Sequence, residues 1–218
     1  MRRNLIIVGG GEHAQAVVEA ANSRPQLWKI EGLVDVNPAA KLRSFPTVRN
    51  LGQDQFLKEK AAREQRWAIL GIGSVSNSSL RRRIVESYGN SRICWAVIIH
   101  AGAWVSSSAA LAPGTVILAG AVVNSGAMLG AHTIVNSGAI IEHNVEIGEF
   151  SVISPACAIG GGTTVGADSF VGIGAKIRDH LKIGRQATVG MGAVVVRDVA
   201  AGATVMGVPA REPQRQKS

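Results

Sequence analysis

The sequence contains little cysteine, few aromatic residues and no long hydrophobic run. Cys94 and Cys157 are the only cysteines among 218 residues and lie far apart, which is too few ligands for a disulfide framework or a zinc site. Aromatic residues make up 4% of the chain, so large rings do not build its core. No apolar run has membrane-spanning length, and residues 4–8 are too short for a secretory signal. We expect no metal, no membrane insertion and a reducing, cytoplasmic location.

Acidic residues are also scarce: 15 Asp and Glu stand against 23 Lys and Arg, giving a net charge of +8. This excess fits either a plain basic surface or a protein that binds polyanionic ligands such as nucleotides. Nucleic acid is a weaker option, because no basic stretch is interleaved with aromatic residues.

A strict period of six fills the second half of the chain. Every sixth residue from Val105 to Val195 is Val, Ile or Leu, and the residue two positions earlier is mostly small. A period of six fits neither an α-helix nor a plain strand but is typical of a hexapeptide β-helix. Cys157 occupies one of the small positions, so we expect it to pack in the core.

Three hexads make one triangular coil, so sixteen hexads predict about five stacked coils that bury a continuous aliphatic column. The series has no interruption between Val105 and Val195, so no long loop is inserted there to close an active site. We therefore expect the residues ahead of the repeat to hold the substrate.

The first hundred residues follow a different pattern. We expect strands over 4–8, 30–35, 67–73 and 94–99 and helices over 13–22, 53–64 and 78–87, with Val17, Val18 and Ala21 on an inner helix face and a Ser/Asn-rich loop after the third strand. Alternating strands and helices predict a small Rossmann-like parallel sheet. The expected domains are an α/β domain (1–99), a β-helix (100–200) and a basic tail (201–218).

A glycine turn, Gly9-Gly10-Gly11, joins the first strand to the first helix. Backbone N–H groups at the start of a helix can receive a phosphate or another anion. The turn also fits Gly-x-Gly-x-x-Ala loosely, and Asp35 follows the second strand, so a dinucleotide cofactor is an alternative. A tight turn without any ligand is the third interpretation.

One histidine stands out within the repeat. Ile141 is an inward position, so His143 should lie on the outer surface near a corner of the coil. Histidine titrates near neutral pH and suits a general base, although a lone surface histidine is often only a surface residue. His100, His132 and His180 have no better claim from position alone.

Taken in order, several segments make the chain resemble the bacterial hexapeptide-repeat sugar acyltransferases. Within them it resembles most the group of sialic acid O-acetyltransferases and nucleotide-amino-sugar N-acetyltransferases. The segments that carry the resemblance are Gly9-Gly10-Gly11-Glu12-His13, Gly32-Leu33-Val34-Asp35, Gly71-Ile72-Gly73, Ile141-Glu142-His143, Ile147-Gly148-Glu149-Phe150 and Gly207-Val208-Pro209-Ala210-Arg211.

The resemblance implies a left-handed parallel β-helix, a homotrimer, and acetyl-CoA bound along the helix at subunit interfaces. It implies that His143 is the general base, with Asn144 orienting the ring. For a nucleotide-linked sugar it implies the binding residues Gly11, Glu12, His13, Asp35, Gly73 and Asn136. For acetyl-CoA it implies Gly161, Ile173 and Met191, and we expect Arg197 and Arg211 to meet the CoA phosphates.

Three positions depart from the family pattern. Asn144 stands where the family often has an acidic residue, so His143 should be less basic. Val152 replaces a histidine that contacts acetyl-CoA in some relatives, and Glu12 puts a carboxylate where glycine is common.

The resemblance favours transfer of an acetyl group to the amino group of a nucleotide-linked amino-deoxy sugar, for the synthesis of a surface polysaccharide or another glycan. O-acetylation of sialic acid or another sugar hydroxyl is the nearest alternative. A non-catalytic β-helix scaffold and a nicotinamide-linked reductase are more remote alternatives from other classes of protein.

Overall fold

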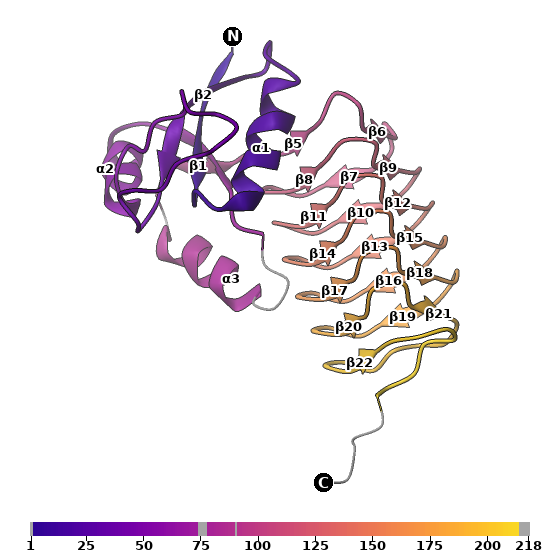
Figure 1. Cartoon of the computed structure of the whole chain (residues 1–218). Coiled ribbons are helices and arrows are strands. Elements are labelled where there is room, and N and C mark those ends of the chain that lie inside the picture. Colours follow the sequence, from indigo (N-terminus) through magenta and orange to yellow (C-terminus); the bar gives the residue numbers. More distant parts are fainter. Residues whose placement is uncertain (1, 74–77, 90, 214–218) are drawn as a thin grey trace, which may run out of the picture.

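The computed structural model of the chain describes residues 2–73, 78–89 and 91–213, and its two parts lie side by side (Figure 1). The first part is a small α/β domain and the second a column of stacked coils. Residues 74–77, in the predicted loop after the third strand, lie outside the described residues.

The α/β domain is built on a parallel sheet of four strands in the order β2-β1-β3-β4. The strands are β1 (Arg3–Val8), β2 (Trp28–Val34), β3 (Arg66–Leu70) and β4 (Ile93–Trp95). The helices are α1 (Glu12–Asn22), α2 (Asp54–Arg63) and α3 (Ser78–Ser87). The predicted inner face of α1 is confirmed, because Val17, Val18 and Ala21 are fully buried.

The second part is a parallel β-helix whose two-residue strands form three flat sheets. The seven-stranded sheet contains β5 (Ile98–Ile99), β8 (Val116–Ile117), β11 (Ile134–Val135), β14 (Val152–Ile153), β17 (Phe170–Val171), β20 (Thr188–Val189) and β22 (Thr204–Val205). The six-stranded sheet contains β6 (Trp104–Val105), β9 (Val122–Val123), β12 (Ile140–Ile141), β15 (Ala158–Ile159), β18 (Lys176–Ile177) and β21 (Val194–Val195). The five-stranded sheet contains β7 (Ala110–Leu111), β10 (Met128–Leu129), β13 (Glu146–Ile147), β16 (Thr164–Val165) and β19 (Lys182–Ile183).

The chain turns through three corners in each coil. Corner 1 joins the seven- to the six-stranded sheet, corner 2 joins the six- to the five-stranded sheet, and corner 3 returns to the seven-stranded sheet. In the coil that starts with β11 these corners are residues 136–139, 142–145 and 148–151.

The period of six puts an aliphatic side chain inside at every strand, as predicted. Ile141, Ile153 and Val171 are fully buried in one continuous core. The small residues two positions earlier fit inside the corners, and those with a hydroxyl donate to carbonyl groups of the next coil. Ser151, for example, donates to the Gly166 carbonyl at 3.0 Å. Cys157 is buried in this core with a free thiol, as predicted.

Two boundaries differ from the sequence prediction. The single strand expected over 94–99 is wrong: β4 ends at Trp95 in the first domain, and β5 already pairs with β8 in the β-helix. The predicted tail from residue 201 is also wrong over its first part, because β22 pairs with β20 and Met206 bridges Arg211. Thr204 and Val205 continue the strand pairing although the six-residue spacing ends at Val195. The period therefore does not predict the last coil.

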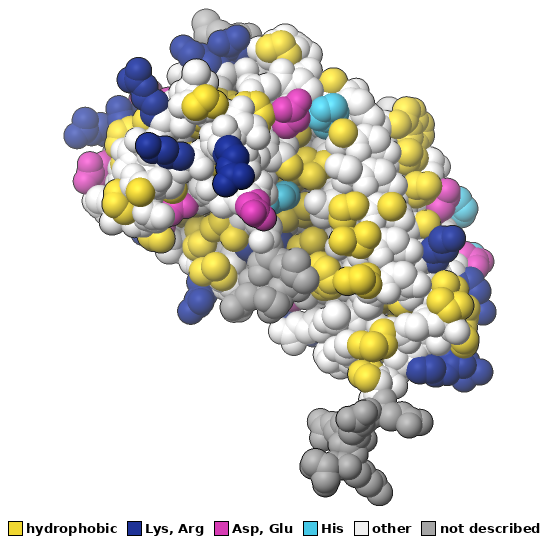
Figure 2. Space-filling model, in the orientation of Figure 1, with side chains coloured by type: hydrophobic (Ala, Val, Ile, Leu, Met, Phe, Trp, Pro, Cys, Tyr) yellow, Lys and Arg dark blue, Asp and Glu magenta, His cyan; other side chains and the backbone are white. Residues whose placement is uncertain are grey.

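The first domain covers the upper end of the seven-stranded sheet. Ile98, Val116 and Leu118 of that sheet pack in one core with Val17 and Leu33. Farther along the same sheet, Ile134, Val152 and Phe170 line a cavity beside the first domain. Hydrophobic side chains are exposed on this side of the β-helix (Figure 2).

Candidate functional site

A cavity of about 460 Å³ lies between the two domains. Glu12, His13 and Gly73 line it from the first domain, and Asn136 lines it from corner 1 of the β-helix. Ile173 and Met191, from two later coils at the same corner, line it as well. Four of the predicted sugar-binding residues and two of the predicted acetyl-CoA residues therefore share one space.

A second cavity of about 380 Å³ lies over the glycine turn. Gly11 and Asp35, the other two predicted sugar-binding residues, line it together with Glu12, His13 and Gly73. Because the last three residues line both cavities, the two spaces meet at the start of α1.

The glycine turn is held by a carboxylate. Asp35 accepts a hydrogen bond from the Gly10 amide at 2.6 Å through Oδ2 and one from the Asn37 amide at 2.7 Å through Oδ1. Gly11 caps α1 without any side-chain hydrogen bond. Among the described residues no acceptor satisfies the amides of Glu12 and His13, so the first turn of α1 presents free N–H groups to the cavity.

His13 sits at the junction of the two cavities with an unsatisfied ring nitrogen. Its Nε2 is shielded from solvent and has no hydrogen-bond partner among the described residues. Burial and, to a lesser extent, the nearby Arg81 guanidinium lower the pKa of His13 to about 4. At neutral pH the ring is therefore uncharged and can still donate or accept one hydrogen bond.

His143 lies at corner 2 and is exposed, as the repeat predicted. Its ring lies against Gly161 of the next coil, where a Cβ built on that glycine would be 2.6 Å from both Cε1 and Nε2. Asn144 follows in the left-handed conformation (φ 56°), and its Nδ2 is 3.4 Å from Nδ1 of His143. These three predicted residues form one group.

That group does not line the cavity between the domains. His143 and Asn136 belong to the same coil, but corner 2 and corner 1 lie at opposite edges of the six-stranded sheet. Arg211 and Arg197 are exposed near the end of the β-helix and also lie outside this cavity. Within one chain, the predicted base and the predicted sugar site are separated.

Sequence reasoning missed the residues that fasten the domains together. The Arg81 side chain is 1% exposed and donates to the carbonyl groups of Phe150 (3.2 Å) and His132 at corner 3. Arg82 forms ion pairs with Glu149 (2.9 Å) and Asp168 (3.0 Å). The run Arg81-Arg82-Arg83 is present in the sequence, but the partners of Arg81 and Arg82 lie 51 to 86 residues away, so no local pattern could reveal them.

His132 belongs to the same junction. Its ring stacks on Phe150 at 4.8 Å between centroids and meets Trp95 edge-on at 5.0 Å. Burial and then the charges of Arg81 and Arg82 lower the pKa of His132 to about 4. Its Nδ1 has no partner in the described part of the chain, and its role is packing.

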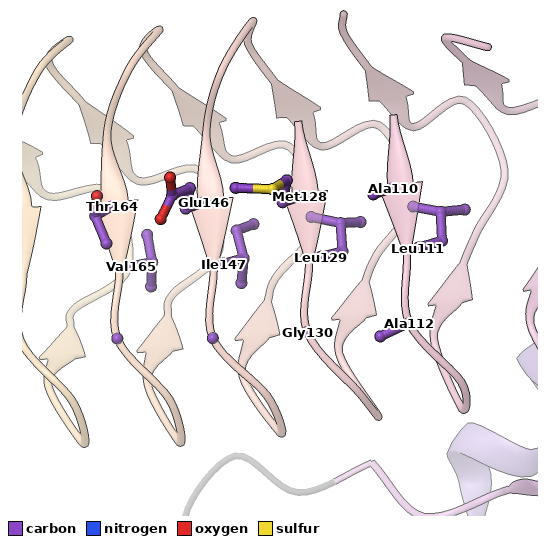
Figure 3. Close-up of a pocket in the computed structure, with 12 residues that line it drawn as sticks. Ala110, Leu111, Ala112, Met128, Leu129, Gly130, Glu146, Ile147, Thr164 and Val165 are labelled. Carbon is purple, nitrogen blue, oxygen red and sulfur yellow. The ribbon is translucent and has the colours of Figure 1, made fainter. Parts of the chain in front are cut away.

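A third hollow, of about 500 Å³, lies on the outer face of the five-stranded sheet (Figure 3). Ala110, Met128, Glu146 and Thr164 project from successive strands along it. Glu146 is the one titratable side chain that lines it, and none of the predicted site residues does so. We assign no chemistry to this face.

Residues 2–73, 78–89 and 91–213 contain no group of three or more His, Cys, Asp or Glu side chains that could hold a metal ion. The helices among them include none that is long and apolar enough to cross a membrane.

Comparisons with known proteins agree with this arrangement. Residues 4–88 match the family described as the PglD N-terminal domain. The acetyltransferase domain of PglB from Neisseria gonorrhoeae, solved with acetyl coenzyme A, is 32% identical; the match covers 98% of this chain and all of that one, with a TM-score of 0.88. PerB from Caulobacter crescentus, solved with CoA and GDP-perosamine, is 30% identical; the match covers 96% of this chain and 97% of that one, with a TM-score of 0.87. No curated protein sequence matches the chain.

The fold and the comparisons together define a hexapeptide-repeat acyltransferase, with a small α/β domain followed by a left-handed parallel β-helix, as predicted. The chain belongs to the family of hexapeptide-repeat sugar acyltransferases that includes the PglB acetyltransferase domain and perosamine N-acetyltransferase. It is therefore an enzyme, and the scaffold and reductase alternatives are set aside.

Proposed function

We propose that the enzyme transfers the acetyl group of acetyl-CoA to the amino group of a nucleotide-linked amino-deoxy sugar during glycan synthesis. The observation that carries this proposal is the cavity that joins the free N–H groups of α1 to corner 1 of the β-helix. Two similar structures support it, since one contains acetyl-CoA and the other contains CoA with GDP-perosamine.

The nucleotide-linked sugar would bind at the glycine turn. Its diphosphate would accept hydrogen bonds from the amides of Glu12 and His13, and the positive end of the α1 dipole would favour its charge. The His13 ring lines both cavities and would lie beside the sugar nucleotide. Asp35 would act mainly by holding the turn, because both of its oxygens already accept backbone hydrogen bonds.

Acetyl-CoA would lie against the later coils. Ile173 and Met191 are 55% and 77% exposed at corner 1 and offer an apolar surface to the pantetheine arm. Val152 lines the same cavity, so this wall is apolar where some relatives place a histidine. Arg197 and Arg211 would meet the CoA phosphates at the end of the helix.

A second copy of the chain would complete the site. If three chains pack with their six-stranded sheets facing a threefold axis, corner 2 of one subunit comes beside corner 1 of the next. Trp104 and Ile140 project from that sheet and are 54% and 39% exposed, which fits a surface covered in a homotrimer. His143 would then act on a sugar bound in the partner's cavity.

In the reaction, the sugar amine attacks the thioester carbonyl carbon while His143 Nε2 removes its proton. The C–N bond forms, the C–S bond breaks, and the imidazolium returns the proton to the CoA thiolate. The amide of Gly161 has no acceptor among the described residues and lies beside the ring, so it is a candidate donor to the oxyanion.

Asn144 favours the amine over a hydroxyl as acceptor. For Nε2 to act as a base, the proton must sit on Nδ1, and the Asn144 amide must turn its oxygen toward it. An asparagine adds no negative charge, so the base is weaker than one paired with a carboxylate. An amine needs less activation than a sugar hydroxyl, and O-acetylation is the less favoured reaction.

We place this reaction in the cytoplasm. Both cysteines are free thiols, and free thiols suit a reducing compartment.

Thiol release from acetyl-CoA, screened against uridine-, guanosine- and thymidine-linked amino sugars, tests the proposed reaction. We expect turnover with at least one amino sugar and none with its hydroxyl counterpart. Activity on free sialic acid with no activity on any nucleotide-linked amino sugar would contradict the proposal.

Mixing two inactive variants tests the shared site. His143→Ala removes the base and Met191→Arg blocks the cavity, so a trimer made of either variant alone should be inactive. Trimers refolded from a mixture should regain activity, because some interfaces then combine both intact halves. No recovery in mixed trimers would contradict a site built from two subunits.

A further inference from the structure

Three consecutive glycines at corner 2, Gly160, Gly161 and Gly162, lie in three different environments. Gly162 has φ +67°, which glycine adopts without strain. A Cβ on Gly160 would be 2.5 Å from the backbone nitrogen of Asp179 in the next coil. Gly161 has neither feature: its φ is not in the left-handed region, and the three atoms nearest to its Cβ position all belong to the His143 ring.

The coil itself does not require a glycine at position 161. The same place in the other coils, at intervals of 18 residues, is occupied by residues with side chains: Ser107, Ser125, His143 and Asp179. The residues that follow Ser125, His143 and Asp179 all have positive φ, as Gly162 does, so the backbone of this turn accepts a Cβ at position 161. The missing side chain at Gly161 therefore needs a different explanation.

We infer that Gly161 is a positioning residue for the imidazole of His143. This inference rests on the proposed role of His143 as the base. A Cβ at residue 161 would be 2.6 Å from Cε1 and Nε2 and 3.1 Å from Nδ1, so the side of the ring that carries both nitrogens lies beside the glycine. Asn144 approaches the ring at Nδ1, and Gly161 lies beside the ring. These two neighbours together set the direction in which Nε2 points.

We expect a side chain at position 161 to displace the His143 ring without changing the backbone of the coil. His143 is exposed, so its ring can rotate away from an added methyl group, whereas backbone atoms of a packed coil cannot. The amide of Gly161 stays in place after substitution by alanine. The change therefore isolates the position of the base from the fold and from the backbone donor.

A double-mutant cycle with Gly161→Ala and His143→Ala tests the inference. We expect Gly161→Ala to lower kcat by about 10- to 100-fold, the cost of a base misplaced by about 1 Å. In the His143→Ala background the same change should have no further effect, because no ring remains to be moved. The Kd for acetyl-CoA, measured by calorimetry, should stay within about twofold of wild type in both backgrounds.

Matched controls use the same turn position in neighbouring coils. Ser125→Ala and Asp179→Ala should keep the wild-type kcat and melting temperature, since among the described residues no hydrogen bond or ion pair joins either side chain to the His143 ring. Gly161→Ser provides a second variant, because serine occupies this position naturally at residue 125.

Three results would overturn the inference. One is an unchanged kcat for Gly161→Ala. Another is weaker acetyl-CoA binding, or an equal loss in the His143→Ala background, since the glycine would then serve the co-substrate directly. The last is a fall in melting temperature for both Gly161→Ala and Gly161→Ser. Full activity of His143→Ala alone would instead refute the proposed function.

Discussion

Histidines occupy two contrasting regions of this enzyme. At the domain junction, His13 and His132 are shielded from water beside Arg81, and burial keeps both rings uncharged at neutral pH. At corner 2, His143 and His180 are exposed on the outer edge of the coils. The same side chain thus packs in the interior in one region and, in the other, is exposed where the proposed proton transfer would occur. Burial, and not residue type, separates the two uses.

Removing the exposed histidine should separate activity from stability. We expect His143→Ala to lower kcat/KM by about 10²–10⁴-fold, the usual contribution of a general base. The melting temperature should stay at the wild-type value because the ring is exposed and fills no core space. Steady-state kinetics and thermal unfolding measure the two effects, with His180→Ala, at corner 2 two coils further on, as the control.

The buried histidines should make stability fall on acidification. The pKa of each is about 4 in the folded protein and 6.5 when exposed, so between these values the unfolded state binds more protons. Their contribution is complete above pH 6.5 and is lost as the pH falls toward 4. The slope is up to about 1.4 kcal/mol per pH unit for each ring.

Chemical unfolding between pH 4 and 7 checks this slope. His132→Gln should reduce it, whereas His180→Gln should leave it unchanged, because that side chain is 74% exposed. If the free energy of unfolding changed with pH by the same slope in both variants, the buried and exposed histidines would not differ in their effect on stability.

The arginine beside the buried histidines should matter for domain packing. Arg81→Met keeps much of the side-chain volume but leaves the carbonyl groups of His132 and Phe150 without their donor. Each unsatisfied carbonyl costs about 1–3 kcal/mol, so the free energy of unfolding should decrease. The neighbouring Arg83 is exposed, and Arg83→Met should change little when both are compared by denaturant unfolding.

The smallest expected effect comes from changing Asn144, which lies beside the exposed His143 ring. Asn144→Asp would place a carboxylate near Nδ1 of His143 and stabilise the protonated ring. We expect the acidic limb of the kcat/KM profile to move to higher pH, with less than about a tenfold change in the plateau rate. A profile that does not move would mean that residue 144 has no influence on the base.

Several features could be predicted from local sequence alone. The six-residue period identified the β-helix and the buried position of Cys157, and it placed His143 at an exposed corner. The glycine turn identified the start of α1. Two boundaries were predicted wrongly. The residues of β5 were joined to the preceding strand, although Ile99 lies six residues ahead of Val105, and β22 follows the regular series across a shortened connection.

The sequence by itself determined the coil, because each hexad buries its own aliphatic residue and turns its own corner through local contacts. Only the tertiary structure decided which face the first domain covers. That choice depends on Arg81 and Arg82 reaching residues about seventy positions away, and it brings His13 and Gly73 to Asn136 and Met191. This packing of the first domain leaves His143 at the opposite edge of the six-stranded sheet from the cavity between the domains. No local pattern encodes that separation, since it arises from side chains that meet only when the two domains pack.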